Sequence, residues 1–413
     1  MKARALSLLA LCLALASSVF AGEGSVPRGV PHLDHVFVIL MENHAYGQIV
    51  GNPSAPFMNS YLKSVNTAKN YFAVGHPSST NYLEIVGGSN FGDRSDNGPD
   101  WHNNTCTPNL MTGVTSLDTP STGPVCPIYG IGTDAATPAI DLSGNECTAP
   151  CSEIDLDGVL GYPAAPNTVG KTIADQLAER GMSWKSYQES LPPSGADNVT
   201  YSDGFFTDLN IPAGTPGGLI YLYAAKHNPF VYFRSIQEDL KAGANNIVGF
   251  EGQHGLYEDL ASGHVPAFSF IAPNQCNDQH GRGNGGSQCD YDFNDDGTQQ
   301  GLNPALIYVG DLKLGTLIRA IHRSPAWHDG RSAIVVVWDE NDYSLAPNVN
   351  QVLTTVETNY GRGGSSSNRF YTHFSLLRSL EGGLGLPCLN HACDAATNVM
   401  SDLFGGDDDH DRR

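Results

Sequence analysis

Two runs of apolar residues, far apart along the chain, each end abruptly in polar side chains. Residues 36–41 and 332–338 are apolar almost throughout, and each run is short enough to be a strand buried on both faces. The polar residues that follow them are Glu42, Asn43 and His44 in the first case and Asp339 and Glu340 in the second. Because ligands bind beyond the carboxyl ends of strands in an open α/β sheet, we expect these side chains to form the floor of a site.

The pattern between the two runs alternates between strand and helix signals. Strands are indicated over 182–187, 230–233 and 267–272. Helices are indicated over 56–65, from 78 onward, over 169–181 and over 303–322. A last core segment over 371–380 ends at Gly382 and Gly383. Strands that alternate with helices predict an α/β fold with a mostly parallel sheet and helices on both faces.

A cluster of hydroxyl residues precedes the helix signal near position 78. Ser78, Ser79 and Thr80 stand directly before apolar residues at helical spacing, which is typical of a helix N-terminus. A helix that begins here aims N–H groups and the positive end of its dipole at whatever lies beside Ser78. Phosphate groups bind well at such a position.

The chain begins with the pattern of a secretory signal peptide. Lys2 and Arg4 precede a short apolar stretch and a run of small residues, and we expect cleavage after Ala21. No later run is long enough to cross a bilayer, so no stable membrane insertion is expected. The sequence therefore predicts a secreted or periplasmic protein.

Cysteine usage fits an oxidising compartment. The chain has nine cysteines, one of which is Cys12 in the leader, so an even number remains after cleavage. Local disulfides are predicted for two pairs, Cys276 with Cys289 and Cys388 with Cys393. The remaining cysteines, Cys106, Cys126, Cys147 and Cys151, would form two further bridges in one of three connectivities, and a zinc site at Cys147 and Cys151 is the alternative.

The composition changes over residues 93–166, which are rich in Thr, Pro, Gly, Asp and Cys and show no sustained period. A long irregular segment inside a compact domain is usually functional or disordered. The cysteines suggest that this segment is cross-linked by disulfides. We expect a signal peptide over 1–21, one domain over 22–404 with a disulfide-rich insert at 93–166, and a flexible acidic tail over 405–413.

The net charge of -21 argues against nucleic acid or an anionic membrane as a partner, because both require basic patches. An enzyme that handles phosphate then needs local positive potential from a metal ion or from histidines.

A separate calcium site is suggested by Asp292, Asn294 and Asp296, which are followed by Gly297 as in the opening of a calcium loop. Asn303 stands where that loop needs Glu, so an acidic surface turn is the alternative.

Five motifs resemble the secreted phosphoesterase family that includes acid phosphatases and phospholipases C, within the alkaline phosphatase-like superfamily. In chain order they are Glu42-Asn43-His44 with Tyr46, His76-Pro77-Ser78 with Asn81-Tyr82, the segment 274–280, Trp338-Asp339-Glu340, and Tyr371-Thr372-His373. The resemblance extends from about residue 35 to residue 390, with 93–166 as the part that matches poorly.

The resemblance implies a role for each matched residue. The implied metal ligands are Glu42, Asn43, Asp339, Glu340 and the oxygen of Ser78. Ser78 is also the implied nucleophile, and His280 and His373 are implied to bind phosphate or to protonate the leaving group. Thr80 departs from the family pattern, which often has Pro at that position.

These implications predict a secreted, metal-dependent phosphomonoesterase that acts on a small phosphate ester through a phosphoseryl intermediate. The chemistry is coherent, because metal coordination activates a serine hydroxyl and neutralises charge on the transferred phosphoryl group. A phospholipase C-type phosphodiesterase is the first alternative, although phospholipases of the family tend to have Arg in place of Tyr82. A non-catalytic secreted binding protein is the second alternative.

Overall fold

The computed structural model describes residues 23–93, 95–101, 124–132, 167–193, 195–196, 222–282, 285–290, 303–341 and 350–405. The predicted signal peptide, most of the predicted insert and almost all of the acidic tail lie outside these residues. The predicted calcium ligands Asp292, Asn294 and Asp296 also lie outside them, as do Cys106, Cys147 and Cys151.

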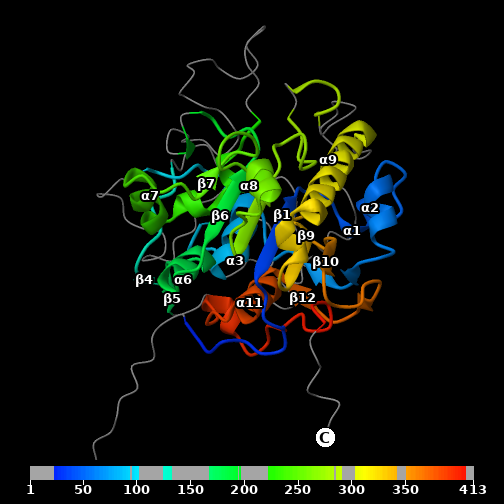
Figure 1. Ribbon diagram of the computed structural model, residues 1–413. Helices are drawn as coiled ribbons and strands as arrows, with labels where there is room; N and C mark the ends of the chain where they lie inside the picture. Colours follow the sequence, from blue (N-terminus) through cyan, green and yellow to red (C-terminus); the bar gives the residue numbers. More distant parts are fainter. Residues whose placement is uncertain are drawn as a thin grey trace, which may run out of the picture.

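A large, mostly parallel sheet forms the centre of the molecule (Figure 1). In spatial order its strands are β11 (Ser366–Ser367), β2 (Asn66–Ala68), β10 (Thr354–Thr358), β9 (Ser332–Trp338), β1 (His35–Met41), β8 (Phe268–Ala272), β6 (Trp184–Gln188) and β7 (Ile247–Val248). The strands from β9 to β7 are parallel to one another, whereas β10 is antiparallel to both β9 and β2. Two small ladders lie outside this sheet among the described residues: β3 (Tyr71–Phe72) pairs with β12 (Tyr371–Thr372), and β4 (Ile131–Gly132) pairs with β5 (Thr168–Val169).

Helices flank the sheet, which confirms the predicted α/β class. They are α1 (Tyr46–Ile49), α2 (Pro56–Tyr61), α3 (Ser78–Gly87), α6 (Ile173–Glu179), α7 (Arg234–Lys241), α8 (Leu256–Ser262), α9 (Pro304–Arg323), α10 (Pro325–His328) and α11 (His373–Leu384), with short 3-10 helices η2 (Ala225–His227), η3 (Pro229–Tyr232) and η5 (Asn390–Cys393). α3 packs against α11, and α9 packs against α2, α8 and α10. In Figure 1, α8 and α9 lie in front of the sheet and α3 lies behind it.

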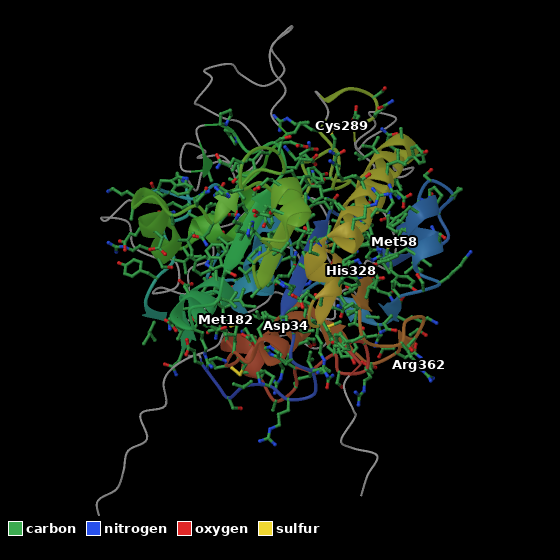
Figure 2. The ribbon with its side chains drawn as sticks, in the orientation of Figure 1. Asp34, Met58, Met182, Cys289, His328 and Arg362 are labelled. Atoms are coloured by element: carbon green, nitrogen blue, oxygen red, sulfur yellow. A yellow bond between two sulfur atoms is a disulfide. The ribbon has the colours of Figure 1, made fainter. Side chains whose placement is uncertain are left out.

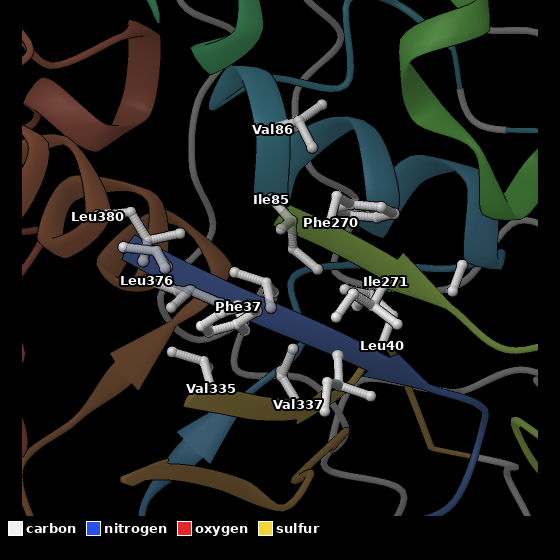
Figure 3. Packing of buried hydrophobic residues seen from close by; sticks show 14 of the residues in the cluster. Phe37, Leu40, Ile85, Val86, Phe270, Ile271, Val335, Val337, Leu376 and Leu380 are labelled. Atoms are coloured by element: carbon white, nitrogen blue, oxygen red, sulfur yellow. The ribbon is translucent and has the colours of Figure 1, made fainter. Parts of the chain in front are cut away.

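The core is built from the apolar runs on which the prediction rested. Every residue from Val36 to Met41 and from Ala333 to Trp338 is buried, since both runs lie in the middle of the sheet. Figure 3 shows side chains of β1, β8 and β9 packed together with side chains of α3 and α11. Burial of this apolar area is the main source of stability for such a sheet.

The pairing of β1 with β9 brings the two polar clusters together. Met41 is the register partner of Trp338, so Glu42 and Asp339 leave the sheet side by side. The N–H of Asp339 donates to the carbonyl of Met41 at 3.0 Å, and the N–H of Glu42 donates to the carbonyl of Asp278 at 2.8 Å. The loops after three adjacent strands are therefore tied to one another at one edge of the sheet.

Two sequence predictions of secondary structure were wrong. Residues 230–233, predicted as a strand, belong mainly to the 3-10 helix η3, whose first residue Pro229 has no N–H to offer a ladder. The helix predicted over 169–181 begins only after Thr172, whose hydroxyl accepts from the N–H of Asp175, and Val169 lies in β5.

Two further helices end at other residues than predicted. α2 ends at Tyr61, before the predicted limit of 65. The last core segment, predicted to end at Gly382 and Gly383, continues as α11 to Leu384, and its C-cap residue Gly385 has a φ of +70°. A Cβ on Gly383 would lie 2.7 Å from a side-chain atom of Leu33, so a side chain there would not fit.

Both predicted local disulfides are present. Cys276 pairs with Cys289 at a Cα–Cα distance of 4.8 Å, and Cys388 pairs with Cys393 at 5.2 Å. Figure 2 shows Cys289 at the same end of the molecule as the start of α9. Among the described helices, none combines the length and the apolar character that crossing a bilayer requires.

Candidate active site

Ser78, the first residue of α3, lies between carboxylates that follow the two central strands. Its Oγ is 3.3 Å from Oε2 of Glu42 and 3.0 Å from Oε1 of Glu340. All three side chains are buried. The structure therefore brings together three residues that are far apart in the sequence and that were all predicted to lie in the site.

Asn81, one helical turn after Ser78, fixes the loop that leads into α3. Its Oδ1 accepts from the N–H groups of Val74 and Gly75, and its Nδ2 donates to the carbonyl of Gly75. The same Nδ2 donates to Oε2 of Glu340 at 3.0 Å. Nδ1 of His76 is 2.7 Å from that oxygen, so Asn81 and His76 together orient Glu340.

Asp339 and Asn43 complete the polar residues at the ends of the central strands. Asp339 is fully buried, and no N–H or O–H group of the described residues donates to either oxygen of its side chain. Asn43 follows Glu42 directly and is half-buried. A further buried carboxylate, Asp278, lies behind Glu42 in the loop after β8.

The carboxylates raise one another's pKa. Burial raises the pKa of Glu42 to about 8, which Lys226 opposes and Glu340 increases. Burial and then the charges of Glu42 and Glu340 raise the pKa of Asp339 well above its ordinary value. The pKa of Asp278 is raised in the same way, by burial first and by Glu42 second. Without a bound cation, such a group of carboxylates cannot all be ionised in a dry pocket.

Lys226 and His227, in η2, enter the site although sequence reasoning did not select them. Nε2 of His227 is 3.1 Å from Oε1 of Glu42, and its Nδ1 is 3.2 Å from Oδ2 of Asp278. The imidazole stacks on the ring of Tyr82 with centroids 5.3 Å apart. Burial, and next the charge of Lys226, lowers the pKa of His227 well below its ordinary value, so the ring is neutral. The only signal in the sequence was the Lys-His pair before Asn-Pro, in a segment without periodicity.

His280 lies in the loop after β8, as predicted, and contacts Lys226. Its Nδ1 is 2.8 Å from the carbonyl of Gly281, to which it donates, and its Nε2 accepts from Nζ of Lys226 at 3.2 Å. Burial, followed by the charge of Lys226, lowers the pKa of His280 to about 3. The backbone N–H of His280 donates to Oδ1 of Asp278 at 2.7 Å, so Asp278 helps to hold this loop in place.

Gln279 connects the loop after β8 to Trp338 and to α9. It has a φ of +83°, and its Oε1 accepts from Nε1 of Trp338 at 3.0 Å. Its Nε2 donates to the carbonyl of Ile307 in α9. The side chain also lies against Gly310, where a Cβ would come within 2.3 Å of Cγ of Gln279. The position of His280 therefore depends on a close contact between the loop and α9.

His373, the first residue of α11, uses both ring nitrogens in contacts with the protein. Nε2 is 2.6 Å from the carbonyl of Asp339 and Nδ1 is 3.0 Å from the hydroxyl of Tyr71. Burial lowers the pKa of His373 to about 4, so the neutral ring donates from Nε2 and accepts at Nδ1. This geometry suits a residue that holds the backbone of Asp339 in place.

The carboxylates fit a cation. The two side-chain oxygens of Asp339 are buried and have no hydrogen-bond donor among the described residues. Together with the carboxylates of Glu42 and Glu340, they are the oxygen ligands that hard divalent cations prefer. A second set of candidate ligand atoms, from Glu42, His227 and His280, lies within 4.8 Å of one another. Nitrogen ligands of this kind favour softer cations such as zinc. Glu42 belongs to both sets.

Residues 52–288 match the Phosphoesterase family. The chain belongs to this family. The family hydrolyses phosphoric esters, and the chain is accordingly a hydrolase of this class.

Relatives with assigned names agree with the family. A phosphatidylinositol-3-phosphatase of Mycobacterium tuberculosis is 25% identical over 405 residues, which cover 96% of this chain and 94% of that protein. An acid phosphatase of Aspergillus niger is 26% identical over 61% of this chain, and a phosphate-repressible acid phosphatase of Penicillium chrysogenum is 28% identical over 60%. The chain spans about half the length of these two fungal proteins, 51% and 49% respectively.

Solved structures show a more distant likeness. A protein of the alkaline phosphatase superfamily from Vibrio parahaemolyticus covers 91% of this chain at 12% identity, with a TM-score of 0.45 and 73% of its own length matched. The lipoteichoic acid synthase LtaP of Listeria monocytogenes covers 93% at 9% identity, with a TM-score of 0.44 and 77% of its own length matched.

Proposed function

We propose that this phosphoesterase is a metal-dependent phosphomonoesterase that forms a phosphoseryl intermediate on Ser78. The observation that carries the proposal is the position of Ser78 Oγ, at the N-terminus of a helix and within hydrogen-bond distance of Glu42 and Glu340. A helix N-terminus stabilises the phosphoryl group, and the carboxylates orient the hydroxyl.

In the first step, Ser78 Oγ bonds to phosphorus and the ester oxygen leaves. The nearest acceptor for the hydroxyl proton is Oε1 of Glu340, at 3.0 Å. The leaving oxygen takes up a proton, for which His280 is our candidate: its Nε2 lies in the site beside Lys226, and the negative charge of a bound phosphate ester would raise the pKa of the ring from about 3 so that Nε2 can carry the proton. Water then cleaves the phosphoseryl bond and restores the serine.

A divalent cation held by Glu42, Asn43, Asp339 and Glu340, with Ser78, would supply the positive charge that activates the hydroxyl and neutralises the phosphoryl group. The buried oxygens of Asp339 support this set of ligands. Lys226 and His227 add basic groups on the other side of Glu42. We assign His373 to positioning, because both of its nitrogens contact the protein.

The monoesterase is preferred over a phospholipase C-type phosphodiesterase. The relatives reported above are named as phosphatases, and Tyr82 is the residue that the resemblance associates with phosphatases. The proposed substrate is a small phosphate ester. The natural compartment proposed is extracellular or periplasmic after cleavage near Ala21, which the two disulfides support. We also retain the proposal of one domain over 22–404.

The test compares hydrolysis of p-nitrophenyl phosphate with that of p-nitrophenylphosphorylcholine, before and after treatment with a chelator. We expect the monoester to be the better substrate and chelation to abolish its hydrolysis. Restoration by Mg²⁺, Ca²⁺ or Mn²⁺ would support the oxygen ligands, whereas restoration by Zn²⁺ alone would favour Glu42, His227 and His280. Full activity in metal-free protein, or a preference for the diester, would contradict the proposal. Thr80→Ala is the matched control for Ser78→Ala, because Thr80 is a buried hydroxyl residue in the same turn.

A further inference from the structure

The carboxylate of Asp96 reaches into the site from the segment 95–101. Its Oδ1 accepts from the N–H of Ser79 at 3.0 Å, and its Oδ2 accepts from Nζ of Lys226 at 2.8 Å. Each oxygen thus has its own donor. Sequence reasoning did not select Asp96, which falls in the predicted insert.

The two donors are groups that suit a phosphate. Ser79 is the second residue of the ten-residue helix α3, so its N–H points out of the first turn and has no acceptor within the helix. It directly follows the proposed nucleophile Ser78. Lys226 is a buried cation, with its side chain 7% exposed, and Nζ also contacts His280. A helix N–H beside a buried ammonium group is a strong site for an anionic oxygen.

The two sides of this contact differ in their access to water. The side chain of Asp96 is 21% exposed, whereas that of Lys226 is 7% exposed. The carboxylate can therefore leave and be hydrated, while the ammonium group stays buried and requires an anion beside it. The negative charges of Asp96, Glu42 and Glu340 all act on the ammonium group of Lys226.

We propose that Asp96 occupies the subsite for the non-bridging oxygens of the phosphate ester and competes with the substrate for Ser79 N–H and Lys226. This inference rests on the proposed function, and it adds an internal carboxylate that limits affinity for phosphate. When a phosphate ester binds, two of its oxygens replace the two oxygens of Asp96. No covalent bond changes in this exchange.

Asp96 also influences which phosphate esters bind. The carboxylate repels a dianionic monoester more than a monoanionic diester, because Coulomb repulsion scales with the charge of the ligand. Removal of the charge of Asp96 should therefore increase the affinity for monoesters more than the affinity for diesters. Asp96→Asn keeps the size of the side chain and removes only the charge.

The experiment measures binding of inorganic phosphate to the metal-reconstituted protein by calorimetry, and inhibition of p-nitrophenyl phosphate hydrolysis by phosphate. Asp96→Asn should bind phosphate about tenfold more tightly and lower KM by a similar factor, as expected for loss of one charged competitor. The matched control is Glu179→Gln, which removes a carboxylate from the exposed ion pair with Lys171 and should change neither value.

A double-mutant comparison decides whether the competition acts through Lys226. Lys226→Met should weaken phosphate binding, and in that background Asp96→Asn should lose most of its effect. Weaker phosphate binding by Asp96→Asn, or an equal gain with and without Lys226, would overturn the inference. If the wild type hydrolyses no phosphate ester and binds no phosphate, the proposed function fails as well. If the wild type is active but Asp96→Asn binds phosphate no better, the inference alone fails.

Discussion

Replacement of His373 by alanine separates a positioning role from an acid role. The ring is fully buried, donates from Nε2 to the carbonyl of Asp339 at 2.6 Å and accepts at Nδ1 from the hydroxyl of Tyr71 at 3.0 Å. His373→Ala leaves the buried carbonyl of Asp339 without this donor, whereas the hydroxyl of Tyr71 keeps its interaction with Thr354. An orphaned buried group costs about 1–3 kcal/mol, so we expect the free energy of unfolding to fall by about 1–3 kcal/mol from this lost hydrogen bond.

The effect on catalysis should be the same for every leaving group. Because His373 contacts Asp339 and not the ester, its loss should lower kcat/KM about 10–100-fold, as for other residues that orient metal ligands. The assay is a plot of log kcat/KM against the pKa of the leaving group for wild type, His373→Ala and His280→Ala. His373→Ala should keep the wild-type slope, whereas His280→Ala should make it steeper.

A control variant distinguishes loss of stability from loss of positioning. His391→Ala removes another buried histidine, whose Nδ1 contacts Asp394 and whose ring packs on Phe374 near α11. It should lower the unfolding free energy without changing kcat. A steeper slope in His373→Ala together with wild-type stability would refute the positioning role and make His373 the acid.

Three other substitutions test the surrounding structure. Gly310→Ala should lower kcat and stability, the latter by about 1–3 kcal/mol, because its Cβ would clash with Gln279 under the His280 loop; wild-type kinetics would show that the loop tolerates the shift. Asp311→Ala should cost about 1–2 kcal/mol in urea unfolding with kcat unchanged, since Asp311 accepts from two N–H groups in the first turn of α2; unchanged stability would contradict this capping role. Burial raises the pKa of Glu381 well above 4.5, so the wild type loses stability as pH rises above about 4.5. Glu381→Gln should therefore gain stability relative to wild type as pH rises above about 4.5, and a pH-independent difference would refute that shift.

The parts of the site that could be predicted are those with a strong local signal. The apolar runs before Glu42 and Asp339 had the length and composition of buried strands, and their pairing was then a consequence of the parallel sheet. Ser78 followed from hydroxyl residues at the start of a helical pattern. In each case a few adjacent residues carried the information.

The remaining contacts depend on tertiary structure. Lys226 and His227 belong to a 3-10 turn without periodicity, and the neighbouring apolar residues 230–233 were too few to tell a strand from a turn. Asp96 contacts Ser79 only because the segment after α3 folds back over the start of the same helix. The role of His373 depended on Tyr71, which lies about three hundred residues away in sequence and pairs with the strand before α11.

The most direct test of the central claim is to trap the phosphorylated enzyme. Protein mixed with excess p-nitrophenyl phosphate is quenched in acid within one turnover, digested, and analysed by fragment-ion mass spectrometry of the peptide that contains Ser78, Ser79 and Thr80. We predict one phosphate group on Ser78, none in Ser78→Ala, and a folded Ser78→Ala protein that does not turn over substrate. Phosphate on a different residue, or continued turnover by Ser78→Ala, would contradict the account.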